Sequence, residues 1–333
     1  MMGNSSIDLS LANIWRNWFK FKRGKRKTSE LEIFNYFLEE NLCALHLDLT
    51  SGCYRHGGYK KFIVTGSKRR EISVTDIRDR VVHRLLYEYL VAIYDKTFIY
   101  DAWSCRKGKG LLGVIERTQK FLDRHKDSFI WRADIKKFFD NVDQNTLRQV
   151  ISLRIKDETA SCLLQKVIGS YFTPARHEIE RVNARPRKGM PIGNLTSQIF
   201  ANIYLNELDR FVKYSIRPQA YLRYGDDFII ITKNLEQLQR IRGEVIAFLQ
   251  EKLRLEINVK HDIIIKSKYG LKFLGVELFP AGRRLNKRNK RRALMRLNTK
   301  NFGSYSGMIK NHSKDKTVKE FNWIVLQKLS GEF

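Results

Sequence analysis

Three carboxylates in this sequence have the types and order that metal-dependent nucleotidyl transfer requires. Asp226 and Asp227 are adjacent in Tyr224-Gly225-Asp226-Asp227, and Asp134 follows the apolar stretch Phe129-Ile130-Trp131-Arg132-Ala133 much earlier in the chain. Magnesium prefers oxygen ligands, and two ions about 3.5–4 Å apart on shared carboxylates can activate a primer 3′-oxygen and stabilise departing pyrophosphate. The trio predicts a template-directed polymerase.

Strands are expected to present these carboxylates. Phe129 to Ile135 predicts a buried strand that delivers Asp134 at its end. Ala220 to Arg223 and Phe228 to Thr232 predict a hairpin with both adjacent aspartates at its turn. An Asp-rich surface turn is the alternative, but apolar flanks on both sides favour a buried sheet, where charges need a metal or a partner.

Other patterns predict the elements around this sheet. Apolar residues at helical spacing predict helices over Glu30 to Leu45, Asn194 to Tyr214 and Glu236 to Leu253, with Lys260 in a strand-like segment beyond the last. Two further strands, Lys61 to Val64 and Glu71 to Val74, are joined by a basic turn whose cations suit a triphosphate.

The charge of the chain predicts a polyanionic partner. Lys and Arg number 63 against 35 Asp and Glu, a formal net charge of +28. Phosphate neutralisation with counterion release is the usual reason, although ribosomal and membrane-surface proteins share such a composition. Arg283 to Arg296 suits a backbone-gripping thumb or a solvated helix face. Trp15 to Lys27 suits base stacking and also a helix that packs its rings into the fold.

Length and cysteine usage bound the class of protein. With 333 residues and 43% hydrophobic content, the chain is long enough for about two cored domains. The scattered Cys43, Cys53, Cys105 and Cys162 indicate neither a zinc site nor a disulfide framework. Ile7 to Trp18 is too polar for a signal sequence, and no apolar run approaches about 18 residues. We expect a soluble cytoplasmic protein without a membrane partner.

The ordered motifs resemble those of reverse transcriptases over about residues 60–330. Asp134 with Phe139 resembles the first palm motif, Gly189 to Gln198 the second and Tyr224 to Asp227 the third. Lys260 falls at the position of the family's fourth-motif lysine, and Phe273-Leu274-Gly275 is similar to its primer grip.

Within that family the chain resembles the enzymes of diversity-generating retroelements. In Pro191-Ile192-Gly193-Asn194-Leu195-Thr196-Ser197-Gln198 an aliphatic residue precedes the glycine, where group II intron and retron enzymes generally have Gln. Asp79 to His83, Cys105 to Gly110 and Ser304 to Gly307 add to the likeness. Gly225 departs from it, because this subgroup more often has a bulkier residue there. Tyr-Gly-Asp-Asp also occurs in RNA-dependent RNA polymerases, so the choice between dNTPs and rNTPs stays open at this position. Phe139 favours DNA synthesis, since its ring would clash with a 2′-hydroxyl.

The resemblance implies an α+β right-hand polymerase with fingers, palm and helical thumb. The expected boundaries are a basic, aromatic, helical extension over 1–59, fingers over 60–128 and 144–188, palm over 129–143 and 189–275, and thumb over 276–333. About 35 residues then follow the basic run, too few for an RNase H, endonuclease or maturase domain.

The resemblance also implies roles for individual residues. Asp134, Asp226 and Asp227, with the backbone carbonyl of Ile135, would hold two Mg²⁺ ions, with Mn²⁺ as a substitute, and Lys260 would act as general acid. The expected nucleotide-binding residues are Lys68, Arg70, Phe139, Ile192, Gly193, Ser197 and Gln198. The expected template–primer residues are Arg106, Tyr224, Phe273, Leu274, Gly275, Arg291 and Arg292.

The implied partners are an RNA template supplied by the retroelement RNA, a DNA primer and cDNA, dNTPs, and a small pentameric helical accessory protein. Ile192 supplies only shape where a glutamine could hydrogen-bond near the nascent pair, so we expect errors, particularly opposite template adenines. The alternatives are a defence-associated reverse transcriptase of prokaryotes, an RNA-dependent RNA polymerase and a catalytically silent RNA-binding scaffold.

Overall fold

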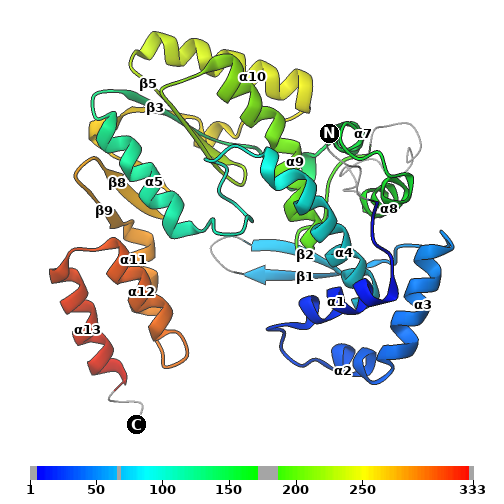
Figure 1. Cartoon of the computed structure of the whole chain (residues 1–333). Coiled ribbons are helices and arrows are strands. Elements are labelled where there is room, and N and C mark those ends of the chain that lie inside the picture. Colours follow the sequence, from blue (N-terminus) through cyan, green and yellow to red (C-terminus); the bar gives the residue numbers. More distant parts are fainter. Residues whose placement is uncertain (1–5, 66–68, 172–186, 330–333) are drawn as a thin grey trace, which may run out of the picture. The chain divides into compact units, whose positions relative to one another are not determined.

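The computed structural model describes residues 6–65, 69–171 and 187–329 of the chain. The chain divides into two compact units (Figure 1). Unit 1 comprises Met1–Ile99, Ile135–Phe211 and Val245–Asn258; unit 2 comprises Tyr100–Asp134, Val212–Glu244 and Val259–Phe333. Helices accompany antiparallel strands in both units, which confirms the expected α+β class.

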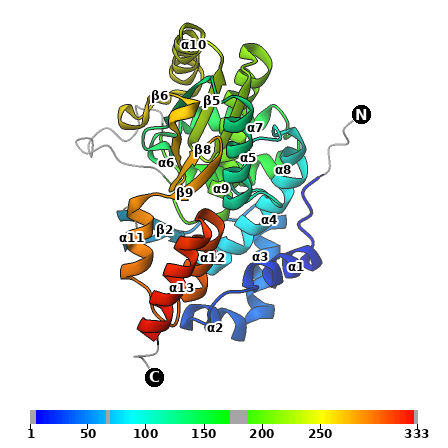
Figure 2. The same ribbon diagram turned by 90° about the vertical axis from the view of Figure 1, so that its left-hand side faces the viewer.

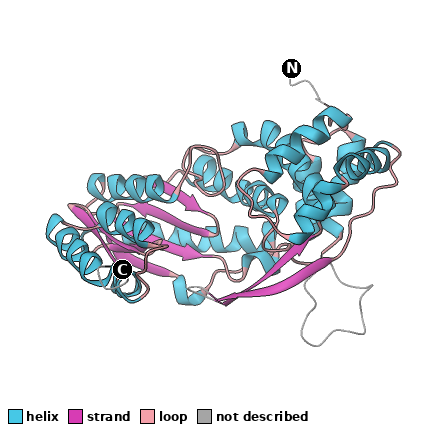
Figure 3. Cartoon of the chain, turned by 90° about the horizontal axis from the view of Figure 1, so that it is seen from below, coloured by secondary structure: helices cyan, strands magenta, loops and turns pink. Residues whose placement is uncertain are grey.

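Unit 1 is mainly helical, with one two-stranded ribbon that Figure 3 shows in magenta. The ribbon pairs β1 (Tyr59–Thr65) with β2 (Arg69–Thr75), as the sequence predicts. Helix α4 (Ile77–Tyr94) packs against α1 (Leu11–Lys22) and α9 (Leu195–Arg210). The other helical elements of the unit are α2 (Ser29–Tyr36), α3 (Leu38–Thr50), η1 (Asp95–Thr97), α6 (Phe138–Asn141), α7 (Gln144–Ser152) and α8 (Glu158–Gly169).

Polar side chains determine where several of these helices begin. Ser10, Thr28, Asp143 and Asp157 each accept a hydrogen bond from a backbone amide in the first turn of α1, α2, α7 and α8, respectively. Such caps satisfy amides that have no partner within the helix. The cap at Asp143 thus marks the start of α7.

The single helix expected over Glu30 to Leu45 is wrong, because the chain breaks it at Phe37. This residue has φ −98° and ψ 37°, outside helical values, between α2 and α3. The side chain of Asn41 donates to the carbonyl of Phe34 at 3.1 Å, which satisfies a group left over at the end of α2. A local side-chain bond therefore competes with helix continuation, although the apolar spacing runs through the break.

Unit 2 contains the sheet that carries the three aspartates. Its strands are β3 (Phe129–Asp134), β4 (Ala220–Tyr224), β5 (Asp227–Thr232) and β6 (Ile263–Lys266), in the antiparallel order β4-β5-β3-β6. Residues 228–232 are all buried, so both faces of β5 are covered. The hairpin strands β4 and β5 are therefore buried, as their apolar sequences predict, whereas the edge strand β6 is partly exposed.

The two faces of this sheet pack differently. Ile130, Ile229 and Ile231 join a core cluster with α5 (Leu111–Arg124). On alternate positions the rings of Trp131 and Phe228 meet edge to face, with centroids 5.3 Å apart. Continuous apolar strands thus hold the aspartate-bearing ends in place.

The C-terminal part of unit 2 forms a second, three-stranded sheet with helices beside it. The strands are β7 (Leu271–Phe273), β8 (Val276–Phe279) and β9 (Gly282–Leu285), and the helices are α11 (Lys287–Met295), α12 (Phe302–His312) and α13 (Asp315–Leu329). Figure 2 shows α12 and α13 side by side. The basic run Arg283 to Arg296 is divided between β9 and α11. The expected palm–thumb boundary after Gly275 falls between two paired strands, β7 and β8.

The remaining elements of the chain are α10 (Leu235–Leu253), η2 (Phe211–Ile216), η3 (Val259–His261) and η4 (Ser267–Tyr269). Among the described residues, no helix combines the length and hydropathy needed to cross a bilayer. All four cysteines are unpaired and exposed. In the aromatic segment near the N-terminus, Trp18 is fully buried and stacks on Phe34, whereas Phe19 is exposed. Part of this segment therefore serves packing.

Candidate active site

Backbone pairing places Asp134 directly opposite Asp227. They are register partners at the ends of β3 and β5. Tyr224 also pairs with Asp227, so Gly225 and Asp226 form the two-residue turn of the hairpin. Gly225 has φ +65°, a conformation that glycine adopts without strain. The sheet thus brings together the strand ends that carry all three predicted carboxylates.

A buried arginine supports this turn. Arg223 is fully buried, and its Nη1 donates to the carbonyl of Gly225 at 2.9 Å. Its backbone also bonds with the loop before α5: Arg223 donates to the carbonyl of Asp101, and Trp103 donates to the carbonyl of Arg223, both at 2.9 Å. The sequence identified Arg223 only as one residue of a short strand, because a single cation in an apolar run does not reveal what it contacts.

The carboxyl of Asp227 lies in a mixed electrostatic environment. Burial is the main cause that raises its pKa above the ordinary value, and the negative charge of Asp134 raises it further. Arg132 opposes both effects, because its Nη2 donates to Asp227 Oδ1 at 2.9 Å. His261 also lowers this pKa through its charge. Sequence reasoning missed Arg132 and His261 as members of the site.

The oxygen donors of the three aspartates suit a hard divalent cation in type. As they stand, however, no three His, Cys, Asp or Glu side chains in the described part of the chain are gathered closely enough to hold a metal ion. The pKa of Asp227 is raised mainly by burial, and carboxyl groups with perturbed pKa values are concentrated at functional sites. The oxygen donors of the three aspartates therefore fit a divalent ion in type. Their side chains are not yet arranged around a common metal position.

The two other predicted residues of the catalytic centre have different surroundings. Lys260 lies in the 3₁₀ helix η3, so the strand expected there is wrong; the strand β6 begins three residues later. Asp262, between them, accepts hydrogen bonds from the side chains of Trp131 and Arg242. Ile135, whose carbonyl is an expected metal ligand, forms an isolated antiparallel β-bridge with Ile257, and both residues belong to unit 1.

The expected nucleotide-binding segment is held against β2 within unit 1. Ser73 donates its backbone amide to the carbonyl of Ile192 at 2.8 Å, and Asn194 Nδ2 donates to the carbonyl of Ser73 at 2.7 Å. Gly193 has φ +120°, and a Cβ there would lie 2.7 Å from Ile72 Cγ2. Glycine is therefore required for this close approach.

Other expected nucleotide-binding residues lie in the same unit. Phe139 is half-buried in α6, and its carbonyl accepts from Met190 at 2.8 Å, which ties the first predicted motif to the second. Ser197 is buried and Gln198 exposed in the first turns of α9, and Arg70 is exposed on β2. Lys68 lies outside the described residues.

The expected template–primer residues all belong to unit 2. Phe273 is buried at the end of β7, while Leu274 and Gly275 form the turn to β8 with φ of +48° and +86°. Asn289 Nδ2 donates to the carbonyl of Gly275 at 3.0 Å and so anchors that turn to α11. Arg106 donates to the carbonyl of Ala102, and Tyr224 is half-buried. Arg291 and Arg292 lie on α11, beside a surface recess lined by Lys287, Arg288, Arg291, Arg292, Met295 and Arg296.

Known proteins resemble this chain over most of its length. Residues 58–278 match the family model described as "Reverse transcriptase (RNA-dependent DNA polymerase)". Protein YkfC of Escherichia coli (strain K12) is 24% identical over 278 residues, which cover 72% of each chain. The group II intron-encoded protein LtrA of Lactococcus lactis subsp. cremoris is 24% identical over 309 residues, covering 73% of this chain and 50% of LtrA. A putative COX1/OXI3 intron 2 protein of Saccharomyces cerevisiae is 23% identical, and the match covers 63% of this chain but only 30% of that protein.

Solved structures resemble the fold. Telomerase from Candida albicans, solved with a fragment of telomeric RNA, has a TM-score of 0.51 at 11% identity, covering 84% of this chain and 55% of that one. Apo telomerase from Candida tropicalis also has a TM-score of 0.51, at 12% identity, covering 82% and 57%. This likeness agrees with the right-hand polymerase fold expected from the sequence. The family model matches residues 58–278, well over half of this chain, so the chain belongs to the reverse transcriptase (RNA-dependent DNA polymerase) family.

Proposed function

We propose that this protein copies an RNA template into DNA by adding dNTPs to a primer 3′-end at Asp134, Asp226 and Asp227. The observation that carries the proposal is the register of β3 and β5, in which Asp134 and Asp227 face each other and Asp226 lies in the adjoining turn. Membership of the family supports it.

Divalent metal ions are used generally in this family. We assign the three aspartates as ligands for Mg²⁺ or Mn²⁺, with the backbone carbonyl of Ile135, the residue after Asp134, as a further ligand. When bound, such ions supply activation of the attacking oxygen and stabilisation of the departing pyrophosphate. Lys260, exposed on η3, is the proposed proton donor to pyrophosphate.

Selection of the nucleotide is assigned to unit 1. Arg70 would contact the triphosphate, since a guanidinium fork matches phosphate oxygens. Phe139 would exclude a ribose 2′-hydroxyl, which favours dNTPs. The segment from Ile192 to Gln198 would contact the base pair being formed, and its attachment to β2 gives that segment a fixed backbone.

The subtype we propose is the error-prone enzyme of a diversity-generating retroelement, working on the retroelement RNA with a small helical accessory protein in the cytoplasm. Ile192 supports it, because an aliphatic side chain can test the shape of a base pair but cannot hydrogen-bond to it. The named bacterial relative LtrA is encoded by a group II intron, so the subtype rests on this motif.

Primer extension on an adenine-containing RNA template tests the proposal. Extension with dNTPs and divalent metal, lost in Asp227→Ala, is the expected result; extension with rNTPs alone would overturn the assignment of the sugar. Sequencing of the products tests the subtype. Errors concentrated opposite adenine should fall in Ile192→Gln, while Ile33→Gln, the same change at an exposed position of α2, should leave them unchanged. Accurate wild-type DNA would point instead to a defence-associated enzyme.

A further inference from the structure

A chain of buried polar side chains crosses the core of unit 1. His83, on α4, is 1% exposed and has a hydrogen-bond partner at each ring nitrogen. Its Nε2 lies 2.9 Å from His56 Nε2, and its Nδ1 lies 3.1 Å from Thr196 Oγ1. Beyond His56, Nδ1 of that ring lies 2.6 Å from the carbonyl of Gly57. The chain thus joins the segment before β1 to the first turn of α9.

The acceptor at one end assigns the protons along this chain. The carbonyl of Gly57 can only accept, so His56 carries a proton on Nδ1, and in the neutral tautomer its Nε2 accepts. His83 must then donate from Nε2 and accept at Nδ1, which leaves the hydroxyl of Thr196 as donor. Burial and the neighbouring His56 lower the pKa of His83 to about 3, which keeps its ring in this neutral form.

Asp79 forms a second set of bonds one helical turn earlier on the same face of α4. Its carboxylate is 2% exposed and accepts three hydrogen bonds of 2.8 Å, from Tyr54 Oη, Thr75 Oγ1 and the amide of Gly57. Thr75 is the last residue of β2, so Asp79 fixes the base of the ribbon.

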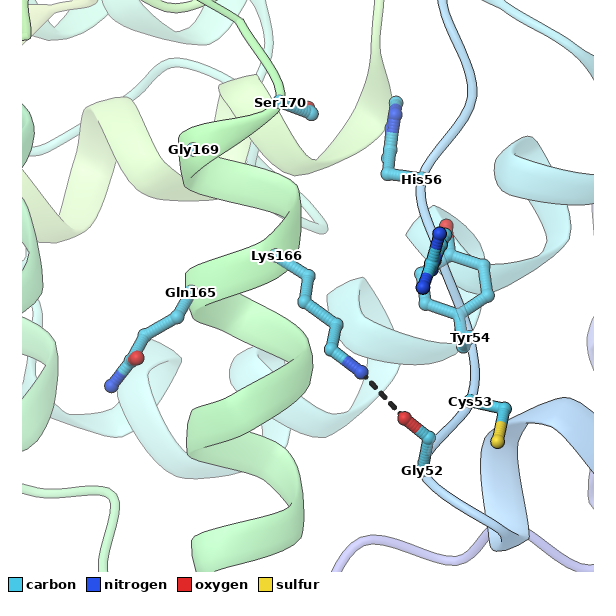
Figure 4. Close-up of a pocket in the computed structure, with 9 residues that line it drawn as sticks. Gly52, Cys53, Tyr54, His56, Gln165, Lys166, Gly169 and Ser170 are labelled. Atoms are coloured by element: carbon cyan, nitrogen blue, oxygen red, sulfur yellow. Dashed lines mark hydrogen bonds between the residues drawn. The ribbon is translucent and has the colours of Figure 1, made fainter.

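The segment that carries His56 is itself anchored on its outer side. Figure 4 shows residues 52–56 beside α8, where Lys166 Nζ donates to the carbonyl of Gly52 at 2.7 Å. Tyr59 Oη and Ser170 Oγ lie 2.7 Å apart close by. The segment that carries His56 is therefore anchored to α8 and to Ser170, which follows that helix.

These bonds converge on the predicted nucleotide-selecting segment. Asp79 bonds to Thr75 at the end of β2, and Ser73 of the same strand bonds to Ile192 and Asn194. His83 bonds to Thr196, two residues after Asn194. We propose that Asp79 and His83 are positioning residues that keep the backbone from Ile192 to Thr196 in place for selection of the incoming nucleotide. The inference rests on the proposed function and adds residues that would touch neither nucleotide nor metal.

Three variants test the positioning role. Thr196→Val keeps the shape but removes the donor; His83→Leu removes both ring contacts; His83→Gln retains a donor and an acceptor. Thr118→Val is the matched control, because Thr118 is equally buried but its hydroxyl bonds only to Val114 within its own helix.

Two measurements on the full chain decide the outcome. Hydrogen exchange read by mass spectrometry should be faster over residues 69–75 and 189–198 in Thr196→Val and His83→Leu, and near wild type in His83→Gln and Thr118→Val. On a primed RNA template, the first two variants should raise the KM for dNTP about tenfold with kcat changed less.

Wild-type exchange in those segments, or an equal increase along the whole chain, would overturn the positioning role, as would an unchanged KM and error frequency. If the wild-type protein extends no primer, the proposed function fails, and hydrogen exchange still decides whether His83 and Thr196 hold this backbone.

Discussion

Arg132 and Asp227 form a diagonal ion pair across β3 and β5, with Arg132 Nη2 donating to Asp227 Oδ1 at 2.9 Å. Asp134, on the same face of β3, is the direct cross-strand partner of Asp227. The carboxylate of Asp227 thus has a like charge opposite it and a cation diagonal to it. Arg132 also donates to the carbonyl of Lys272 and lies over the ring of Phe273, which joins the catalytic strand to β7.

We therefore predict that Arg132→Ala lowers kcat at least about tenfold and destabilises the fold by about 1.5–3 kcal/mol, since a hydrogen bond to a charged group is lost at a largely buried site. Arg132→Lys should have intermediate values of kcat and of the free energy of unfolding, because lysine keeps the positive charge but lacks the several donors of the planar guanidinium. Primer-extension rates and denaturant unfolding provide the measurements.

Arg284→Ala is the control for this prediction. Arg284 pairs with Glu277 at 2.8 Å, but its side chain is 68% exposed, so the loss should stay within about 1 kcal/mol. A wild-type rate in Arg132→Ala would show that Asp227 keeps its place without the arginine.

A matched pair of glycine substitutions tests the contact between Gly193 and β2. Gly193→Ala should destabilise by about 1–3 kcal/mol and impair extension, because φ is +120° and the new Cβ would meet Ile72 at 2.7 Å. Gly243→Ala should instead stabilise by about 0.5–1 kcal/mol, since that position lies inside α10 with nothing within 4 Å of a new Cβ. The midpoints of unfolding of both variants provide the measurement. If Gly193→Ala and Gly243→Ala shift the midpoint equally, the close approach of Gly193 to Ile72 would be contradicted.

The sequence predicted the aspartate sheet well because its strands are continuous apolar runs with the carboxylates at their ends. The hairpin from Ala220 to Thr232 and the strand that begins at Phe129 match the structure to within one residue at each end. Apolar spacing alone, by contrast, carried the predicted helix through the break at Phe37 and did not indicate the 3₁₀ turn at Lys260.

Contacts between residues far apart in the chain could not be predicted in this way. Arg223 lies in an apolar run, and nothing in that run indicates that its side chain bonds to the turn of the aspartate hairpin. Likewise, Asp79 and His83 have helical spacing, but their partners Thr75 and Thr196 were not identifiable from that spacing. Only the fold shows which buried polar groups satisfy one another.

His83 should make folding stability depend on pH. Its folded-state pKa of about 3 lies below the value of 6.5 in the unfolded chain, owing first to burial and then to the neighbouring His56 and Arg80. The unfolded chain therefore binds the extra proton, so stability present above pH 6.5 is lost as pH falls towards 3. Between pH 6.5 and 5 the loss should be about 2 kcal/mol.

Unfolding midpoints of the wild type and His83→Gln, measured between pH 6.5 and 5, isolate the contribution of His83 to the pH dependence of stability. Asp79 and His56 remain in both proteins. The two pH curves should lie close together near neutral pH and separate on the acid side, where only the wild type loses stability through His83. Parallel curves would mean that another group accounts for any acid lability.

The helix α11 concentrates positive charge on one short element, which suits a polyanionic partner. Lys287, Arg288 and Lys290 lie in its first turn and Arg291 and Arg292 follow, with no acidic residue in the first turn to balance the helix dipole. We predict that the double change Arg291→Ala and Arg292→Ala weakens RNA binding equally for different sequences. It should also reduce the slope of log Kd against log salt by about one to two, because each phosphate contact releases a counterion. Removing two exposed cations of α10, Arg240→Ala with Lys252→Ala, should change that slope much less. An equal change in both double variants would show that net charge, and not this helix, binds the nucleic acid.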